Sequence, residues 1–187
     1  MEAHVSFLKQ EILARKGEKR PFLVAVEGGS ASGQSTLGQA LAKALNANLV
    51  HMDDFFLPPE LRTPERFAQP GGNVHWERVL DEVLQPLSAG KPLEYGVFNC
   101  SVMAVDRICR EEVKDIVLVE GAYSLHPRLR EFYDLKVFIT VDEATQKQRI
   151  LTRNGEKMLQ RFLKEWIPLE KAYFEACGVK DCCDIIL

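Results

Sequence analysis

Five short apolar runs along the chain of 187 residues predict the strands of a buried sheet. Most of them are continuous apolar stretches, which are typical of parallel strands covered on both faces. We expect these strands at residues 21–26, 48–52, 116–121, 135–141 and 184–187.

Apolar positions that recur every three or four residues predict helices between these strands. An opening helix with Val5, Leu8, Ile12 and Leu13 facing inward is expected to end near Lys16. Further helices are expected at 36–46, 75–87 and 145–176, the last interrupted near 154–155. The remaining segments are predicted as a long loop or flap at 57–73 and one strand pair within 92–109.

This alternation of strands and helices predicts an α/β fold. Helices should cover both faces of a parallel sheet, and ligands should bind beyond the carboxyl ends of its strands. The length and the ordinary composition fit a single domain over residues 1–187.

Charge and hydropathy indicate which partners and which cellular location to expect. Lys plus Arg number 24 against 27 Asp plus Glu, so the net charge of −3 gives no support for nucleic acid as the main partner. No apolar stretch is long enough to cross a membrane, and residues 1–20 lack the apolar core of a signal peptide, so we expect a cytoplasmic protein. The sequence leaves open whether the chain forms a homo-oligomer.

The five cysteines give no sign of a metal or disulfide site. Their number is odd, two are adjacent, and no spacing matches a zinc or redox pair. We expect reduced and mostly buried thiols. The residues are Cys100, Cys109, Cys177, Cys182 and Cys183.

A glycine-rich segment joins the first predicted strand to the next helix. It follows the Walker A pattern of Gly, any four residues, Gly, Lys, then Ser or Thr, with Gly28, Gly33 and Ser35 in place. A phosphate-binding loop (P-loop) of this kind aims backbone N–H groups and a helix N-terminus at phosphate groups. The alternative is a plain turn of small residues. The expected nucleotide-binding residues are Gly28, Gly29, Ser30, Ala31, Ser32, Gly33, Gln34, Ser35 and Thr36.

Gln34 departs from this pattern, since the position normally holds lysine. The lysine ammonium neutralises the β- and γ-phosphates, whereas glutamine donates hydrogen bonds without a charge. The loss of one preorganised electrostatic contact costs about 10²–10³ in rate. The loop therefore predicts nucleotide binding and leaves turnover open.

Acidic residues stand at the carboxyl ends of two predicted strands. Asp53 and Asp54 follow the second strand, and Glu120 lies at the end of the third. A carboxylate there can accept the proton of an attacking hydroxyl or help to hold Mg²⁺. Acids at strand ends also cap helices and form turns, but the neighbouring loop favours the functional interpretation.

Two arginines and two aromatic residues complete the candidate site. Arg149 and Arg153 lie four residues apart on one helix face, directly before the predicted interruption. Guanidinium groups suit a transferring phosphate and can move with a lid, although solvated surface arginines are the alternative. Phe56 and Phe98 are candidates for the acceptor side, with core packing as their alternative.

Several motifs, in this order along the chain, resemble those of the uridine kinase family. This family belongs to a group of P-loop kinases with phosphoribulokinase and bacterial pantothenate kinase. The resemblance runs from about Phe22 to Leu187, which is nearly the whole chain. The matching segments are 28–36 apart from Gln34, 52–56 (Met-Asp-Asp-Phe-Phe), 70–73 (Pro-Gly-Gly-Asn), 119–121 (Val-Glu-Gly) and 166–170 (Trp-Ile-Pro-Leu-Glu), with Arg149 and Arg153.

The resemblance implies a P-loop NTPase fold of the nucleoside-kinase type with a lid, and it implies ATP and Mg²⁺ as cofactors. It implies Asp53 as the base that takes the acceptor proton. Ser35 and Glu120 would serve the metal ion, and Arg149 and Arg153 would be the lid arginines.

The acceptor side departs from the family. Phe56 stands where the family has tyrosine, and Phe98-Asn99 stands where it has a Tyr-Asp pair. Asp54, Phe56 and Phe98 are nevertheless the expected substrate contacts.

The resemblance thus predicts a kinase that phosphorylates a hydroxyl of a nucleoside or a similar sugar-bearing small molecule. One alternative is a nucleotide-binding regulatory protein without turnover. A GTPase-like switch is a weaker alternative, because the chain has no signature like Asn-Lys-x-Asp.

Overall fold

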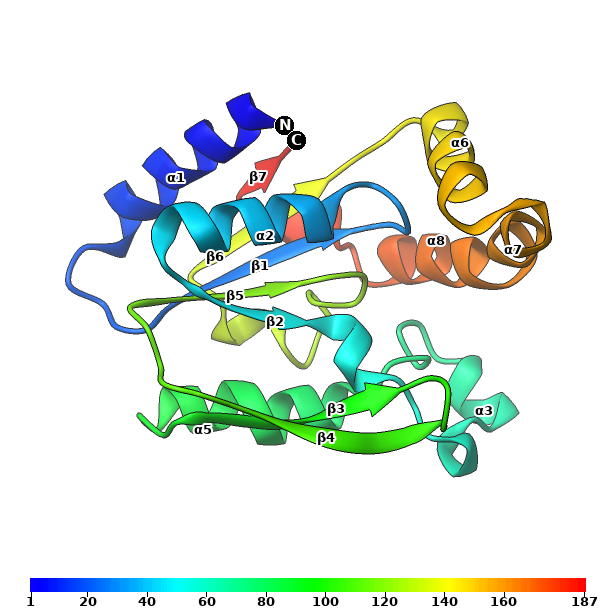
Figure 1. Cartoon of the computed structure of the whole chain (residues 1–187), viewed down its shortest axis with the longest axis horizontal. Coiled ribbons are helices and arrows are strands. Elements are labelled where there is room, and N and C mark those ends of the chain that lie inside the picture. The colour runs from blue at the N-terminus through cyan, green and yellow to red at the C-terminus, as the bar shows by residue number, and fades with distance from the viewer.

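The computed structural model describes residues 1–187, and a five-stranded sheet forms its centre (Figure 1). All strands are parallel and follow the order β2-β5-β1-β6-β7. Their carboxyl ends therefore meet at one edge, where the following loops converge. The strands are Phe22–Gly28 (β1), Asn48–His51 (β2), Ile116–Glu120 (β5), Leu135–Ile139 (β6) and Ile185–Ile186 (β7).

The side chains of β1 alternate between two separate cores. Val24 and Val26 belong to the core beneath α1 (Glu2–Lys16) and α2 (Gln34–Leu45), which cover one face of the sheet. Leu23 lies in the larger core on the opposite face. Burial on both faces explains why the strand is almost continuously apolar.

The opposite face is covered by a helical segment and a two-stranded ribbon. The segment runs through α4 (Trp76–Arg78), a π-helical stretch (Val79–Leu84) and α5 (Gln85–Ser88). The antiparallel ribbon consists of β3 (Leu93–Asn99) and β4 (Ala104–Glu111). Both elements lie below the main sheet in Figure 1.

The predicted flap at 57–73 contains two short helical pieces. These are the 3₁₀ turn Pro59–Leu61 and α3 (Pro64–Phe67). Arg66 ties this segment down, because its guanidinium binds the carboxylate of Glu77 and the carbonyl groups of Gly72 and Val74. Further 3₁₀ turns cover Met52–Phe55, Arg130–Phe132 and Lys180–Cys182.

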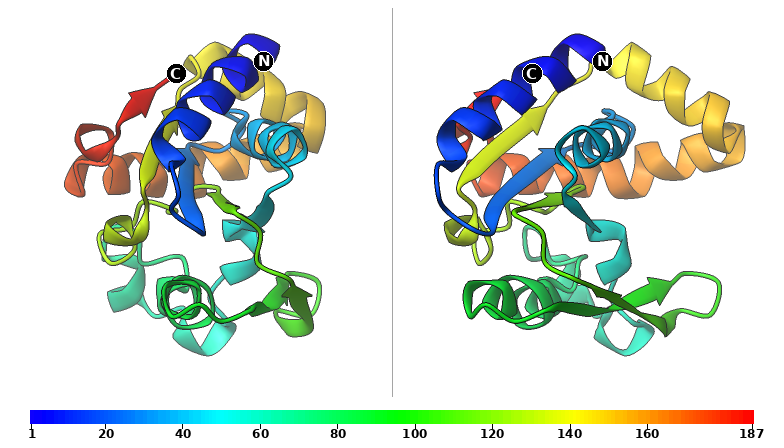
Figure 2. Two further views of the ribbon diagram at one scale, coloured as in Figure 1. Left: turned by 90° about the vertical axis from the view of Figure 1, so that its left-hand side faces the viewer. Right: turned by 60° about the vertical axis from the view of Figure 1, so that its left-hand side comes forward.

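A helical arm projects from the edge where the strands end (Figure 2). It leaves the sheet as α6 and returns as α8, with a break at Gly155, whose φ of 79° favours glycine. This break confirms the predicted interruption. The arm comprises α6 (Glu143–Asn154), α7 (Glu156–Arg161), a π-helical stretch (Phe162–Trp166) and α8 (Ile167–Ala176).

Two details of the sequence prediction are wrong. Leu13 does not face inward but is 52% exposed, because α1 buries only a narrow stripe with Leu8 and Ile12 at its centre. The cysteines are free, but none is buried: Cys100 is exposed and the other four are half-buried.

None of the helices is both long and apolar enough to span a lipid bilayer.

Candidate nucleotide and acceptor site

The P-loop leads from β1 into α2 with its first helical N–H groups unpaired. Helical hydrogen bonding begins with the N–H of Leu37, which donates to the carbonyl of Gly33. The N–H groups of Gln34, Ser35 and Thr36 therefore have no partner in the chain. Unpaired N–H groups at a helix N-terminus attract an anion such as phosphate.

Glycine is required at both ends of the loop for different reasons. A Cβ on Gly28 would lie 2.4 Å from the hydroxyl oxygen of Ser32 and 2.9 Å from the carbonyl oxygen of Ile139. Gly33 has a φ of 110°, in the left-handed region that favours glycine. These constraints explain locally why the Walker A glycines fold the loop in this way.

A cavity of about 380 Å³ opens beside the unpaired N–H groups. Its lining includes the end of the P-loop, the first residue of the chain and both predicted lid arginines. The structure therefore brings Arg149 and Arg153, which are distant along the chain, to the loop. The lining residues are Met1, Ala31, Gly33, Gln34, Ser35, Thr36, Arg149 and Arg153.

Arg149 contacts the loop directly. Its guanidinium donates to the carbonyl oxygens of Ala31 at 3.0 Å and Ser32 at 2.9 Å. Arg153 instead donates to the side chain of Asn154 at 2.8 Å and leaves most of its guanidinium free. Two positive charges thus border the cavity in which Gln34 brings none.

Gln34 is 8% exposed and lies against its own loop. Its side-chain oxygen accepts a hydrogen bond from the hydroxyl of Ser32 at 2.6 Å. The residue at the lysine position is therefore held by the loop itself.

Ser35 and Glu120 lie side by side, as expected of two residues that could hold Mg²⁺. The Ser35 hydroxyl donates to a carboxylate oxygen of Glu120 at 3.0 Å, and Glu120 is only 3% exposed. Hydroxyl and carboxylate oxygens are the kind of ligands that Mg²⁺ takes. These two residues therefore fit a magnesium ion.

His51, which is not among the candidates named from the sequence, joins this pair. Its Nδ1 contacts the second carboxylate oxygen of Glu120, and this hydrogen bond raises the pKa of His51. The two residues are opposite each other in the pairing of β2 with β5. Recognising that the second and third predicted strands are neighbours would have revealed the contact.

Asp53 and Asp54 occupy a 3₁₀ turn directly after β2. The Asp53 side chain is open to solvent, but protein lies around it on several sides. This partial desolvation, followed by the charge of Glu120, raises the pKa of Asp53. Desolvation also raises the pKa of the half-buried Asp54. The positive charge of Arg153 lowers the pKa of Asp53 and so opposes the effect of desolvation. The candidate base and the lid arginine are therefore close enough to interact.

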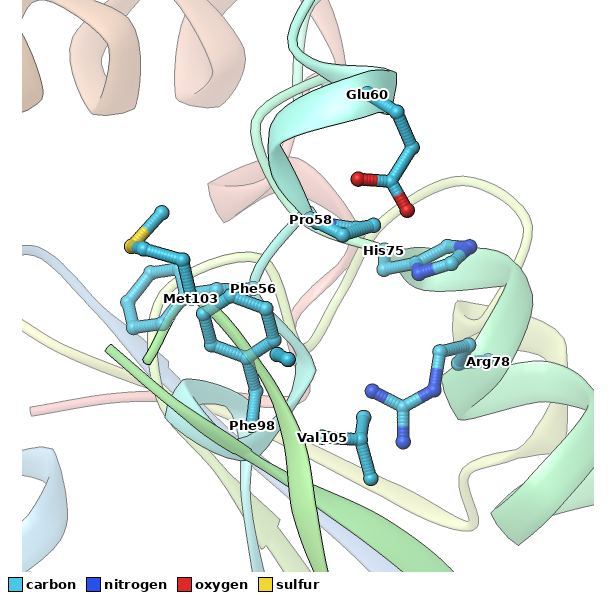
Figure 3. A pocket seen from close by; sticks show the side chains of 9 residues that line it. Phe56, Pro58, Glu60, His75, Arg78, Phe98, Met103 and Val105 are labelled. Atoms are coloured by element: carbon cyan, nitrogen blue, oxygen red, sulfur yellow. The ribbon is translucent and has the colours of Figure 1, made fainter. Parts of the chain in front are cut away.

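A second cavity, of about 280 Å³, lies between the flap and the β3–β4 ribbon (Figure 3). Phe56, Phe98 and Met103 form one side, with the two phenylalanine rings edge to face at 6.3 Å. His75 and Arg78 stand on the other side. Further lining residues are Pro58, Glu60, Ala104 and Val105.

The polar residues of this cavity, His75 and Arg78, were not predicted from the sequence. Burial lowers the pKa of His75, and its buried Nδ1 has no hydrogen-bond partner. Arg78 is paired with Glu82 and also donates to the carbonyl of Gly96. Asp54, an expected substrate contact, does not line this cavity; only its carbonyl oxygen approaches Arg78, at 3.5 Å.

Comparison with known proteins tests the family resemblance that the sequence motifs indicate. No family model matches the chain. The uridine kinase of Clostridium perfringens is 25% identical over 186 residues, which covers 90% of this chain and 88% of that protein. The chain is similar to uridine kinases over most of its length. The resemblance inferred from the motifs is thereby confirmed.

Solved structures confirm the fold. A possible uridine kinase from Bacillus stearothermophilus superposes with a TM-score of 0.76 at 21% identity, and all of both chains is covered. D-glycerate 3-kinase from Cryptococcus neoformans superposes with a TM-score of 0.64 at 16% identity, covering 91% of this chain and 88% of that one. The chain therefore shares the α/β fold of these solved structures.

Proposed function

We propose that the chain is an ATP-dependent small-molecule kinase with a single P-loop domain over residues 1–187. Its acceptor is a hydroxyl group of a nucleoside or a similar sugar-bearing compound. The homologues named uridine kinase support the class of reaction. The fold is also that of a protein named for D-glycerate, so a nucleoside is one of several acceptors that such a fold serves.

One observation carries the proposal. The unpaired N–H groups at the start of α2, the Ser35–Glu120 pair and Asp53 all gather where β1, β2 and β5 end. These are the parts that phosphoryl transfer needs: a cradle for phosphates, ligands for Mg²⁺ and a base. A protein that only binds nucleotide has no need of the base.

In the proposed reaction, the N–H groups of Gln34, Ser35 and Thr36 bind phosphate oxygens of ATP. The acceptor oxygen attacks the γ-phosphorus, the bond from that phosphorus to the bridging oxygen breaks, and ADP leaves. Asp53 takes the proton of the hydroxyl, and its raised pKa makes it a better base. Arg149 and Arg153 supply positive charge at the phosphates.

Ser35 and Glu120 would hold Mg²⁺, which neutralises charge on the phosphates when it is bound. Glu120 also keeps the Ser35 hydroxyl oriented through their 3.0 Å hydrogen bond. His51 in turn fixes the Glu120 carboxylate.

The cavity between the flap and the ribbon is the proposed acceptor pocket. Its aromatic side, Phe56 and Phe98, offers stacking and edge contacts but no hydrogen bonds. His75 and Arg78 form the polar side of the pocket. An acceptor with one flat apolar face and one polar edge fits this lining.

A second candidate function is nucleotide binding without turnover, as in a sensor or regulatory protein. The contact between Gln34 and Ser32 favours it, because no charge is delivered where lysine stands in the Walker A pattern. This alternative keeps the same nucleotide site and removes only the transfer step.

The deciding experiment is an ADP-release assay with Mg-ATP and a panel of nucleosides, sugars and vitamins. We expect ADP release that depends on one acceptor and disappears in Asp53→Asn. If no acceptor is turned over but calorimetry detects a non-hydrolysable ATP analogue, the regulatory function replaces the kinase. If millimolar analogue does not bind at all, both functions are wrong.

A further inference from the structure

Ser30, the third residue of the P-loop, has all three of its polar groups bound by side chains of the helical arm. Its N–H donates to Glu170 at 2.9 Å, and its hydroxyl donates to the other oxygen of the same carboxylate. Its carbonyl oxygen accepts from the side-chain amide of Gln146 at 2.7 Å. Glu170 belongs to α8 and Gln146 to α6, so helices from both limbs of the arm meet at one residue.

The Glu170 carboxylate is buried and accepts its hydrogen bonds from Ser30. It is 5% exposed, and burial raises its pKa, while the two hydrogen bonds from Ser30 favour the charged form. A buried carboxylate without such donors would be strongly destabilising. No other side chain donates a hydrogen bond to it.

A second contact from α8 reaches the beginning of the loop. Tyr173, one turn after Glu170, donates its hydroxyl to the buried carboxylate of Glu27 at 3.0 Å. That carboxylate also accepts the N–H of Gly28. Glu170 and Tyr173 are three residues apart and therefore share one face of α8. This face holds the loop directly at Ser30 and, through Glu27, at Gly28.

Neither Ser30 nor its partners Glu170 and Gln146 line the cavity beside the unpaired N–H groups. We propose that Glu170 and Gln146 are positioning residues that clamp the P-loop at Ser30 to both limbs of the arm. This inference rests on the proposed nucleotide binding. The loop of small residues has many accessible conformations, and fixing it beforehand lowers the entropy lost when the phosphates bind.

The clamp also connects the lid to the nucleotide. Gly155 lies between the two anchored helices and has no atom within 4 Å of where its Cβ would be. Arg149, one turn after Gln146 on α6, is placed on the loop by the same anchor.

The test compares Glu170→Ala, Glu170→Gln and Gln146→Ala with the unmodified chain. Calorimetry measures the Kd of a non-hydrolysable ATP analogue with Mg²⁺, at a temperature well below the melting temperature of each variant. Under this condition a loss of stability alone leaves the Kd unchanged. Glu175→Ala is the matched control, because Glu175 is an exposed glutamate of the same helix.

We expect Glu170→Ala to weaken analogue binding about tenfold, the scale of one lost hydrogen bond to a charged group. Glu170→Gln should stay within about threefold of the unmodified chain, since glutamine can accept from the Ser30 N–H and donate to its hydroxyl. Combined with Gln146→Ala, Glu170→Ala should show a non-additive effect, because both residues hold Ser30.

The inference is overturned if Glu170→Ala binds the analogue like the unmodified chain. It is also overturned if Glu170→Gln is as weak as Glu170→Ala, since charge rather than positioning would then be decisive. If the unmodified chain binds no analogue, the proposed function fails and the clamp fails with it.

Discussion

The side chain of Gln34 is bound to Ser32, two residues earlier in the same loop, by a hydrogen bond of 2.6 Å. Gln34 lines the nucleotide cavity, but its side-chain oxygen is bound within the loop. The guanidinium of Arg149 is bound to the loop carbonyls of Ala31 and Ser32, and Arg153 lines the same cavity. The charge that lysine would bring is therefore either absent from the site or supplied by Arg149 or Arg153.

Gln34→Lys distinguishes these two cases. If the charge is absent, the lysine ammonium stabilises the transition state, in which charge develops on the phosphates, more than it stabilises bound ATP. We then expect kcat to rise by about 10²-fold or more with a smaller change in ATP affinity. Steady-state kinetics with the best acceptor from the panel measures both quantities.

The comparison variants are Arg149→Ala and Arg153→Ala. If one of these arginines already supplies the charge, Gln34→Lys changes kcat little and the alanine variant of that arginine abolishes turnover. If Gln34→Lys stays inactive on every acceptor while the analogue still binds, the kinase proposal yields to the regulatory one.

Ser35→Ala tests the proposed magnesium site. The variant removes a hydroxyl ligand and leaves Glu120 without its 3.0 Å donor. We expect the affinity for the ATP analogue to fall by about tenfold or more in the presence of Mg²⁺, the scale seen when metal sites lose a supporting group. With the metal chelated, the variant and the unmodified chain should bind the analogue equally. Equal loss in both conditions would assign Ser35 to the phosphates instead.

The fold and most of the site could be predicted because their signals are local. The continuous apolar run of β1 indicates a buried strand by itself. The glycines at 28 and 33 indicate the loop by their spacing, and Gly33 has the positive φ that favours glycine. Asp53 and Glu120 were found because parallel strands bring their carboxyl ends to one edge.

The contacts that hold the loop could not be predicted in the same way. Glu170 and Ser30 are 140 residues apart, and although Glu170 lies in a segment that resembles the family, nothing local indicates that its side chain binds Ser30. Leu13 was misjudged for a related reason, since the width of the stripe that α1 buries depends on the surface beneath the helix. Such properties belong to tertiary packing and not to periodicity.

Asp53→Asn tests the proposed base. The variant keeps the shape and a hydrogen-bonding group but cannot take the hydroxyl proton, so kcat should fall by about 10²–10⁴ with ATP affinity nearly unchanged. In the unmodified chain the raised pKa of Asp53 should place the acid limb of the kcat profile above the usual range of aspartate. Asp54→Asn is the paired control at the neighbouring acid, which does not line the acceptor cavity, and it should lower kcat far less than Asp53→Asn. A normal kcat in Asp53→Asn would contradict the role.

Glu27 makes stability depend on pH. It is fully buried at the end of β1, and burial raises its pKa from 4.5 to about 8. Between these values the folded state binds more protons than the unfolded state, so the free energy of unfolding decreases as the pH rises. Below the unfolded value both states are protonated and the contribution is constant; above the folded value the full cost of a buried carboxylate remains.

Glu27→Gln removes this titration while other groups titrate as before. The unmodified chain should therefore lose stability relative to Glu27→Gln between about pH 5 and pH 8, on the order of 1 kcal/mol for each unit of raised pKa. Urea unfolding of both proteins at several pH values measures the difference. The absolute stability of the variant does not decide the outcome, because the amide also loses an acceptor for the N–H of Gly28, Tyr123 or Leu125. A difference that stays constant across this range would show that Glu27 remains ionised, held by those donors.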